Sequence, residues 1–156
     1  MVITQAILDD LTAKAKESPR LRMNLDLRDS AEDTSQRMLN AIEPGSPLPI
    51  HRHQTTSETV VCLRGRLVEE YYQELSDECL ESIEEPSCGA EQRERSKNKR
   101  VQKVQEIELS PNGTVMALNI PAGQWHTVQA LESGTVILEM KNGKYVTTNE
   151  EDILKL

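Results

Sequence analysis

Short strand-like segments separated by glycine and proline turns constrain the fold of this chain more than any other feature of its sequence. In residues 21–27, apolar side chains alternate with polar ones, a period of two that is typical of a strand with one buried face. Later segments of similar length are bounded by turn-forming residues, at Pro44-Gly45, Gly65, Pro111-Asn112-Gly113 and Pro121-Ala122-Gly123. Many short strands with such boundaries indicate an all-β sandwich or barrel.

A helix is predicted before the first strand, because Thr4 can cap it and apolar residues recur at helical spacing to about Lys16. We expect this helix on the outside of the domain. The predicted strands are residues 21–27, 36–42, 57–64, 66–72, 103–109, 114–120, 125–131 and 135–141. The last two strands are expected to form a hairpin, and residues 149–154 a short helix.

Length and charge distribution predict one domain with one insertion. The chain has 156 residues, enough for one core and too few for two, so we expect a single domain over residues 1–156. Residues 73–102 are mostly charged, acidic at first and basic later. We expect them to be a mobile, solvated insertion between two strands, with a functional lid as the alternative.

The overall charge and the apolar content restrict the partners. A formal net charge of −8 would repel a nucleic acid, so no nucleic-acid partner is expected. No apolar run approaches the ~20 residues of a membrane helix, and the first residues do not resemble a secretion signal. We therefore expect no membrane partner and a cytoplasmic location.

The cysteines do not predict a disulfide framework, because their number is odd and no secretion signal is visible. Cys62 lies in an apolar run and is expected to be a buried thiol. Cys79 and Cys88 lie in the charged segment, where two reduced surface thiols are favoured over a disulfide.

Three histidines and one glutamate form the candidate metal site. His51 and His53 are two residues apart, so on a strand both point to the same face. Glu58 shares the parity of the apolar residues at the start of the next strand, and His126 follows a turn at the start of a later one. Taken singly, each could be an ordinary surface or core residue. Together they predict a site for one divalent transition metal ion.

The donor set restricts the ion and its role. Three neutral imidazoles and one carboxylate leave one or two coordination positions open, as catalytic metal sites do. The set lacks a thiolate, so it suits Fe, Mn, Ni, Co or Zn.

Residues 45–65 resemble the first motif of the cupin family, which reads glycine, five residues, His-X-His, four residues, glutamate, six residues and glycine. The second cupin motif is matched by Pro121, Gly123 and His126. It departs at Gly113, where the upstream glycine is displaced, and at Ala130, where asparagine is usual. Neither departure removes a metal ligand. The resemblance implies a double-stranded β-helix (jelly roll) that holds a metal ion.

Residues 18–22, 43–53, 63–66 and 120–128 together resemble the WbuC-type cupin metalloproteins. Members of that group are often encoded among bacterial surface-polysaccharide genes. The resemblance therefore implies a small polar ligand, such as a sugar or nucleotide-sugar derivative. Cupin barrels frequently pair through their sheet edges, so we expect a homodimer.

Three functions remain open from the sequence. The first is a metal-dependent enzyme, either an isomerase or epimerase or an Fe(II) oxygenase. The second is a non-catalytic sensor or accessory protein that binds a metal and a sugar. The third is a structural partner in a biosynthetic complex, with residues 73–102 as its contact surface.

Further candidates for ligand contact are Arg22, Arg37 and Trp125. Either arginine could point into the barrel mouth, where a guanidinium would suit a carboxylate or phosphate. An exposed strand arginine is the favoured alternative for each. Trp125 precedes His126 and could form a pocket wall or pack in the core.

Overall fold

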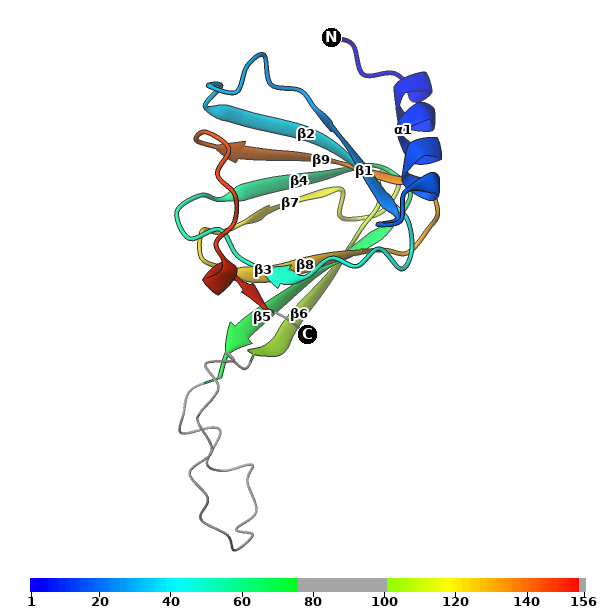
Figure 1. Cartoon of the computed structure of the whole chain (residues 1–156). Helices are drawn as coiled ribbons and strands as arrows, with labels where there is room; N and C mark the ends of the chain where they lie inside the picture. Colours follow the sequence, from blue (N-terminus) through cyan, green and yellow to red (C-terminus); the bar gives the residue numbers. More distant parts are fainter. Residues whose placement is uncertain (76–100, 155–156) are drawn as a thin grey trace, which may run out of the picture.

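The computed structural model describes residues 1–75 and 101–154, which fold as two five-stranded antiparallel β-sheets facing each other, with one long helix outside (Figure 1). The elements in chain order are α1 (Gln5–Glu17), β1 (Arg22–Asp26), β2 (Ser35–Ile42), β3 (Ile50–His51), β4 (Glu58–Arg64), β5 (Leu67–Glu74), β6 (Val101–Leu109), β7 (Ala117–Ile120), β8 (Trp125–Ala130), β9 (Thr135–Asn142), the 3₁₀ turn η1 (Glu150–Asp152) and β10 (Ile153–Leu154).

The strand order is that of a jelly roll. One sheet runs β1-β2-β9-β4-β7 and the other runs β10-β3-β8-β5-β6. Except for β1–β2 and β5–β6, neighbours in each sheet come from distant parts of the chain, so the two sheets are wound together as a double-stranded β-helix. The predicted all-β class with an N-terminal helix is confirmed.

The predicted hairpin between residues 125–131 and 135–141 is wrong. β8 lies between β3 and β5, whereas β9 lies between β2 and β4 in the opposite sheet. The intervening loop is held by other elements. Leu131 N donates to Arg66 O at 2.9 Å, and Gly134 N donates to the Glu43 carboxylate at 2.9 Å. These bonds lead the chain from one sheet to the other, where each strand gains two neighbours.

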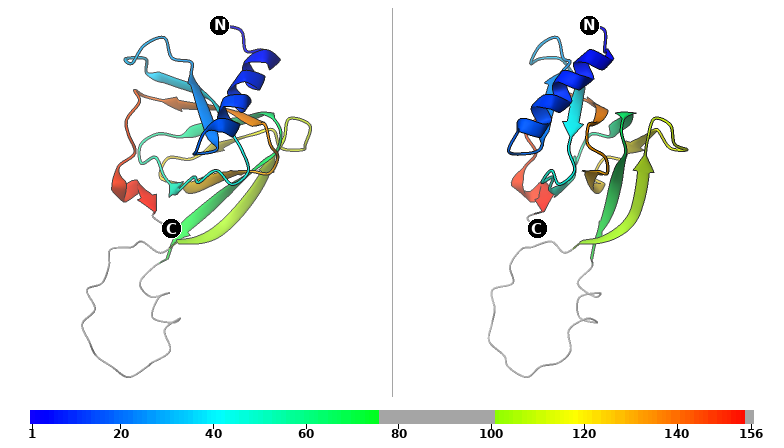
Figure 2. Two further views of the ribbon diagram at one scale, coloured as in Figure 1. Left: turned by 45° about the vertical axis from the view of Figure 1, so that its right-hand side comes forward. Right: turned by 90° about the vertical axis from the view of Figure 1, so that its right-hand side faces the viewer.

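Helix α1 covers the outer face of the β1-β2-β9-β4-β7 sheet, as expected (Figure 2). It begins after Thr4, whose hydroxyl accepts a hydrogen bond from Ile7 N, and it ends at Ser18. Its apolar stripe packs on the sheet in a cluster of Leu8, Leu11, Ala15, Leu39, Ala41 and Val136. No helix in the described part of the chain is long and apolar enough to span a bilayer.

A second cluster fills the space between the sheets and includes Val60, Cys62 and Ile137. Cys62 is 2% exposed, which confirms the predicted buried thiol. Cys79 and Cys88 lie outside the described residues.

Gly65 closes the β4–β5 turn with φ +79°, a conformation that favours glycine. A Cβ there would lie 2.4 Å from Thr135 Oγ1 and 2.8 Å from Thr135 Cα. The turn therefore requires glycine for its backbone angle and for its contact with the start of β9.

The ends of the charged segment and the C-terminal segment differ from the sequence prediction. β5 extends to Glu74 and β6 begins at Val101, so the ends of the predicted 73–102 insertion belong to a paired strand ladder. Residues 76–100 of that insertion lie outside the described residues. The predicted helix at 149–154 is one 3₁₀ turn followed by β10, which pairs with β3.

Candidate metal centre

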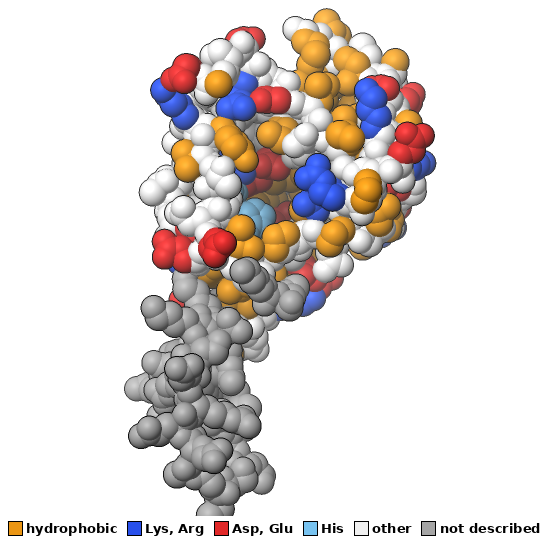
Figure 3. All heavy atoms as spheres, viewed as in Figure 1, with side chains coloured by type: hydrophobic (Ala, Val, Ile, Leu, Met, Phe, Trp, Pro, Cys, Tyr) orange, Lys and Arg blue, Asp and Glu red, His pale blue; other side chains and the backbone are white. Residues whose placement is uncertain are grey.

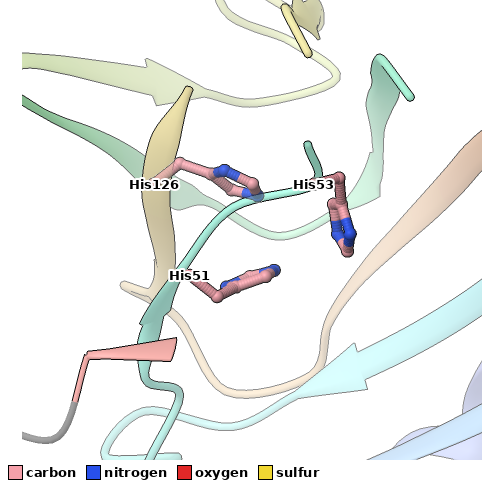
Figure 4. Close-up of side chains that lie close together, drawn as sticks. All are labelled: His51, His53 and His126. Atoms are coloured by element: carbon pink, nitrogen blue, oxygen red, sulfur yellow. The ribbon is translucent and has the colours of Figure 1, made fainter. Parts of the chain in front are cut away.

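The three histidines converge at one point inside the barrel (Figure 4). His51 on β3 is the register partner of His126 on β8, and His53 lies two residues after the end of β3. One ligand nitrogen from each ring lies within 4.8 Å of the other two. The ring centroids are 4.4 Å apart for His51 and His126 and 5.1 Å apart for His51 and His53.

Backbone contacts fix the two segments that carry the rings. Gly123 N donates to His53 O at 2.7 Å, which ties the turn before β8 to the end of the His-X-His segment. Arg52 lies between the two histidines, with its Nε 2.8 Å from Asp152 Oδ1 and its guanidinium stacked on Trp125. The alternation of a strand therefore sends the imidazoles inward and the arginine toward η1.

Hydrogen bonds to backbone carbonyls orient two of the imidazoles. Nδ1 of His51 lies 3.2 Å from Pro49 O, and Nδ1 of His126 lies 2.9 Å from Gln124 O. With Nδ1–H donating to these carbonyls, each Nε2 keeps its lone pair for a metal ion. His126 Nε2 is buried and has no hydrogen-bond partner among the described residues.

Glu58 approaches the histidines from the opposite sheet. Its Oε2 lies 3.2 Å from His53 Nε2 and 3.9 Å from His126 Nε2. This oxygen is buried and accepts no well-directed hydrogen bond from the part of the chain that the structure describes. A buried imidazole nitrogen without a partner that faces a buried carboxylate oxygen fits a shared metal ion, because a metal would bind both.

Lys141 and Glu139 complete the charged interior and were missed in the sequence. Lys141 is the register partner of Glu58 across β4 and β9, and its Nζ lies 3.2 Å from Glu58 Oε2 and 2.7 Å from Glu139 Oε1. Asn40 Nδ2 donates to Glu139 Oε2 at 2.9 Å. Glu139 and Lys141 lie two and four residues after buried Ile137 on β9, so all three point to the same face of the strand. Strand alternation could therefore have predicted that both charged side chains point inward.

The surroundings keep the imidazoles of His51 and His126 neutral and the Glu58 carboxylate ionised. Burial, reinforced by His126, lowers the pKa of His51 to about 3, and burial also lowers the pKa of His126. For Glu58, burial alone would raise the pKa, but the close contact with the His53 imidazole and the ammonium of Lys141 lower the pKa below its usual range. Neutral imidazoles and an ionised carboxylate are the protonation states that bind a metal.

Lys141 remains a cation in this environment. Burial alone would lower the pKa of Lys141, but the carboxylates of Glu139 and Glu58 outweigh burial and raise it. The site therefore has an ammonium group beside two of its four candidate ligands.

A cavity of about 420 Å³ reaches the site from one face of the molecule. Figure 3 shows this face hollowed, with a histidine side chain and acidic side chains in the hollow. His51 and His53 belong to its wall. Its other polar lining side chains are Asn24, Gln36, Asn40, Arg52, Gln54, Thr55, Thr56, Glu139, Lys141, Lys144, Tyr145, Thr147, Thr148, Asn149 and Asp152.

The structure places the three predicted ligand-contact residues elsewhere. Arg22 donates to Pro47 O at 2.7 Å, and Arg37 pairs with Asp33 at 2.5 Å. Trp125 is 3% exposed, and its Nε1 donates to the Glu74 carboxylate at 2.9 Å. None of Arg22, Arg37 and Trp125 is among the described residues that line the cavity.

Solved structures share this fold at low sequence identity. A recombinant oxalate oxidase in complex with glycolate matches with a TM-score of 0.52 and 15% identity, over 83% of this chain and 55% of that chain. KdgF from Halomonas sp. matches with a TM-score of 0.49 and 14% identity, over 82% of this chain and 84% of that chain. The capsular polysaccharide assembling protein CapF from Staphylococcus aureus matches with a TM-score of 0.49 and 18% identity, over 86% of this chain and 35% of that chain. This chain thus spans about half the length of the oxalate oxidase.

The fold and the histidine cluster define a cupin barrel with a potential metal site. By sequence, the chain belongs to the family described as a domain of unknown function, DUF6016, whose family model matches residues 3–83. No curated protein matches the sequence significantly.

Proposed function

We propose that this protein binds one divalent transition metal ion through His51, His53, Glu58 and His126 and uses it to act on a small polar molecule. The observation that carries the proposal is the convergence of one nitrogen from each histidine within 4.8 Å, with the buried and unpartnered His126 Nε2 3.9 Å from Glu58 Oε2. Leaving a buried imidazole nitrogen without a partner is costly unless a ligand satisfies it.

The ions that suit this donor set are Fe, Zn, Mn and Ni. Imidazole binds all of these, and the carboxylate adds a hard oxygen donor and one negative charge. The Nδ1 contacts with Pro49 O and Gln124 O orient the first and last imidazoles in the chain, as outer hydrogen bonds do in metal sites.

The cavity supports a small polar ligand, such as a sugar or nucleotide-sugar derivative. A volume of about 420 Å³ falls within the range of small-molecule sites. Amide and hydroxyl side chains dominate its wall and can both donate to and accept from the hydroxyl groups of a sugar.

Isomerisation or epimerisation is the reaction class that the wall residues favour. A bound ion would supply Lewis-acid polarisation of a ligand oxygen. Burial, with the repulsion of Glu58, raises the pKa of Glu139, which lines the cavity beside Lys141. A carboxyl group with a raised pKa and an ammonium group in one wall can hold or move a proton at an adjacent ligand atom. If the bound ion is Fe(II), the open coordination positions suit an oxygenase instead.

A non-catalytic sensor or accessory protein that binds a metal and a sugar is the second candidate. The enzyme and the sensor differ in the role of Glu139, which the enzyme requires for turnover and the sensor does not. Mass spectrometry of deuterium uptake from D₂O would detect proton exchange in a panel of sugars and nucleotide sugars. Uptake that the wild type catalyses and Glu139→Gln does not would establish the enzyme. Ligand binding without any uptake would establish the sensor.

The finer assignments belong to the same proposal. They are a WbuC-type protein of surface-polysaccharide metabolism, located in the cytoplasm and assembled as a homodimer. Sedimentation of the purified protein tests the dimer, which would have twice the 17.6 kDa mass of the chain.

Elemental analysis of tag-free protein tests the metal site. The wild type should contain about one transition metal ion per chain, and His51→Ala/His126→Ala should contain none. Lys144→Ala is the matched control, because Lys144 lines the cavity and its partner is Glu32. Wild-type protein that stays without metal after reconstitution with each of the four ions would exclude the site.

A further inference from the structure

Lys141 holds its ammonium group against two of the four candidate metal ligands. Its Nζ lies 3.0 Å from His53 Nε2 and 3.2 Å from Glu58 Oε2. The side chain is only 14% exposed, and its strand register with Glu58 fixes where it enters the barrel. This proximity is therefore part of the strand architecture rather than a chance surface contact.

The ammonium group of Lys141 and a metal ion would use the same lone pair on His53 Nε2. A neutral imidazole nitrogen has one in-plane lone pair, which either accepts a hydrogen bond or coordinates a metal. A metal bound there would lie about 2 Å from Nε2. An ammonium that donates to that nitrogen occupies the same direction in space, and its positive charge repels the ion.

Glu139 provides a second position for the ammonium. Its Oε1 lies 2.7 Å from Lys141 Nζ, and Asn40 holds the other oxygen at 2.9 Å. Glu139 and Lys141 both line the cavity. An ammonium that leaves His53 can keep this contact by a rotation of its flexible stem, so a binding metal need not leave it without a counter-charge.

We propose that Lys141 is a built-in competitor of the metal ion for His53 and Glu58, and that metal binding leaves its ammonium in contact with Glu139 alone. The inference rests on the metal site proposed above and adds a residue that sets its affinity. The barrel then discriminates in favour of ions that bind imidazole and carboxylate strongly enough to displace an ammonium. Weakly held ions such as Mg²⁺ are excluded.

Zinc titration of chelator-treated protein, followed by calorimetry, tests the competition. Lys141→Met removes the ammonium and keeps an unbranched stem, and it should bind zinc about tenfold more tightly than the wild type. Lys144→Met is the matched control, because Lys144 lies in the same cavity wall but pairs with Glu32 and not with the histidines. It should change the affinity by less than about threefold, the size of a screened, distant charge effect.

A second pair of variants tests the retained contact with Glu139. Glu139→Gln should weaken zinc binding in the wild-type background, because the displaced ammonium loses its carboxylate. In the Lys141→Met background the same change should have a clearly smaller effect, since no ammonium needs a partner. An equal effect in both backgrounds would show a simple through-space charge effect and overturn the role of the retained contact.

The outcomes separate this inference from the metal site itself. Zinc binding by the wild type with no gain in Lys141→Met would overturn the competition and leave the metal site standing. If no protein in the series binds zinc, the site and the inference both fail. Lys141→Gln, which keeps a donor without the charge, serves as the deciding variant if circular dichroism shows that Lys141→Met does not fold.

Discussion

His51 and His126 are register partners on the adjacent antiparallel strands β3 and β8, with ring centroids 4.4 Å apart. The ladder that pairs the strands therefore also spaces two of the candidate metal ligands. β3 has only two residues and is also paired with β10, where Ile153 lies opposite His51. Contacts that hold the C-terminal segment should consequently affect the metal site.

Arg52→Met should weaken metal binding without removing a ligand. Arg52 donates to Asp152 Oδ1 and stacks on Trp125, so it fixes η1 and the segment between the two histidines. We expect a several-fold loss of zinc affinity and a fall of about 2 kcal/mol in the free energy of unfolding. Trp125 is the single tryptophan of the chain, so its fluorescence reports the change directly.

Arg28→Met is the control for that prediction. Arg28 also lies over an aromatic ring, Tyr145, and pairs with Asp26, but neither contact involves the histidine segment. Its zinc affinity should match that of the wild type. Equal losses in the Arg28 and Arg52 variants would contradict the proposed support of the histidines by Arg52.

Glu69→Gln should make the protein more stable at neutral and alkaline pH. Glu69 is 1% exposed, its Oε1 has no partner among the described residues, and burial with the repulsion of Glu58 raises its pKa to about 9. Unfolded chains release this proton near the ordinary value of 4.5, so wild-type stability falls as the pH rises from about 4.5 to about 9. In urea unfolding with chelator present, the free energy of unfolding of the variant should exceed that of the wild type by at least about 1 kcal/mol near pH 8. The two values should be equal near pH 4.5.

Glu70→Gln should show the opposite pH dependence. Partial burial opposes the shift, but the hydrogen bonds from Tyr72 and Lys103 lower the pKa of Glu70 below its ordinary value. Ionised Glu70 therefore stabilises the fold above that value, and this contribution is lost as the pH falls through the lowered pKa. If both variants had the same pH profile, the assigned environments of the two neighbouring carboxyl groups would be wrong.

Gly65→Ala should destabilise the fold more than Gly134→Ala. Both glycines have positive φ, so each alanine should cost about 1–2 kcal/mol of backbone strain. Only at Gly65 would the new Cβ meet the start of β9, 2.8 Å from Thr135 Cα, and this overlap should add about 1–3 kcal/mol. Urea unfolding of the two variants isolates the contact, and equal losses would refute it.

The sequence predicted most strand positions and the convergence of the histidines because both follow from local patterns. The two-residue spacing predicted that His51 and His53 share one face, although β3 ends at His51, and the turn before His126 starts β8. Strand partners are not local, which explains the wrong hairpin: the loop at 132–134 has turn residues whether it joins neighbours or crosses between sheets. The same limit hid the pairing of Lys141 with Glu58, which are opposite each other only because β4 and β9, distant in sequence, are adjacent.

The measurement that tests the central claim most directly is anomalous X-ray diffraction from crystals of the metal-loaded protein. The proposed site predicts one strong peak per chain, about 2.0–2.2 Å from Nε2 of His51, His53 and His126 and from a carboxylate oxygen of Glu58. Lys141 Nζ should then contact Glu139 and not His53. A peak elsewhere on the molecule, or no peak in crystals grown with saturating metal, would contradict the account.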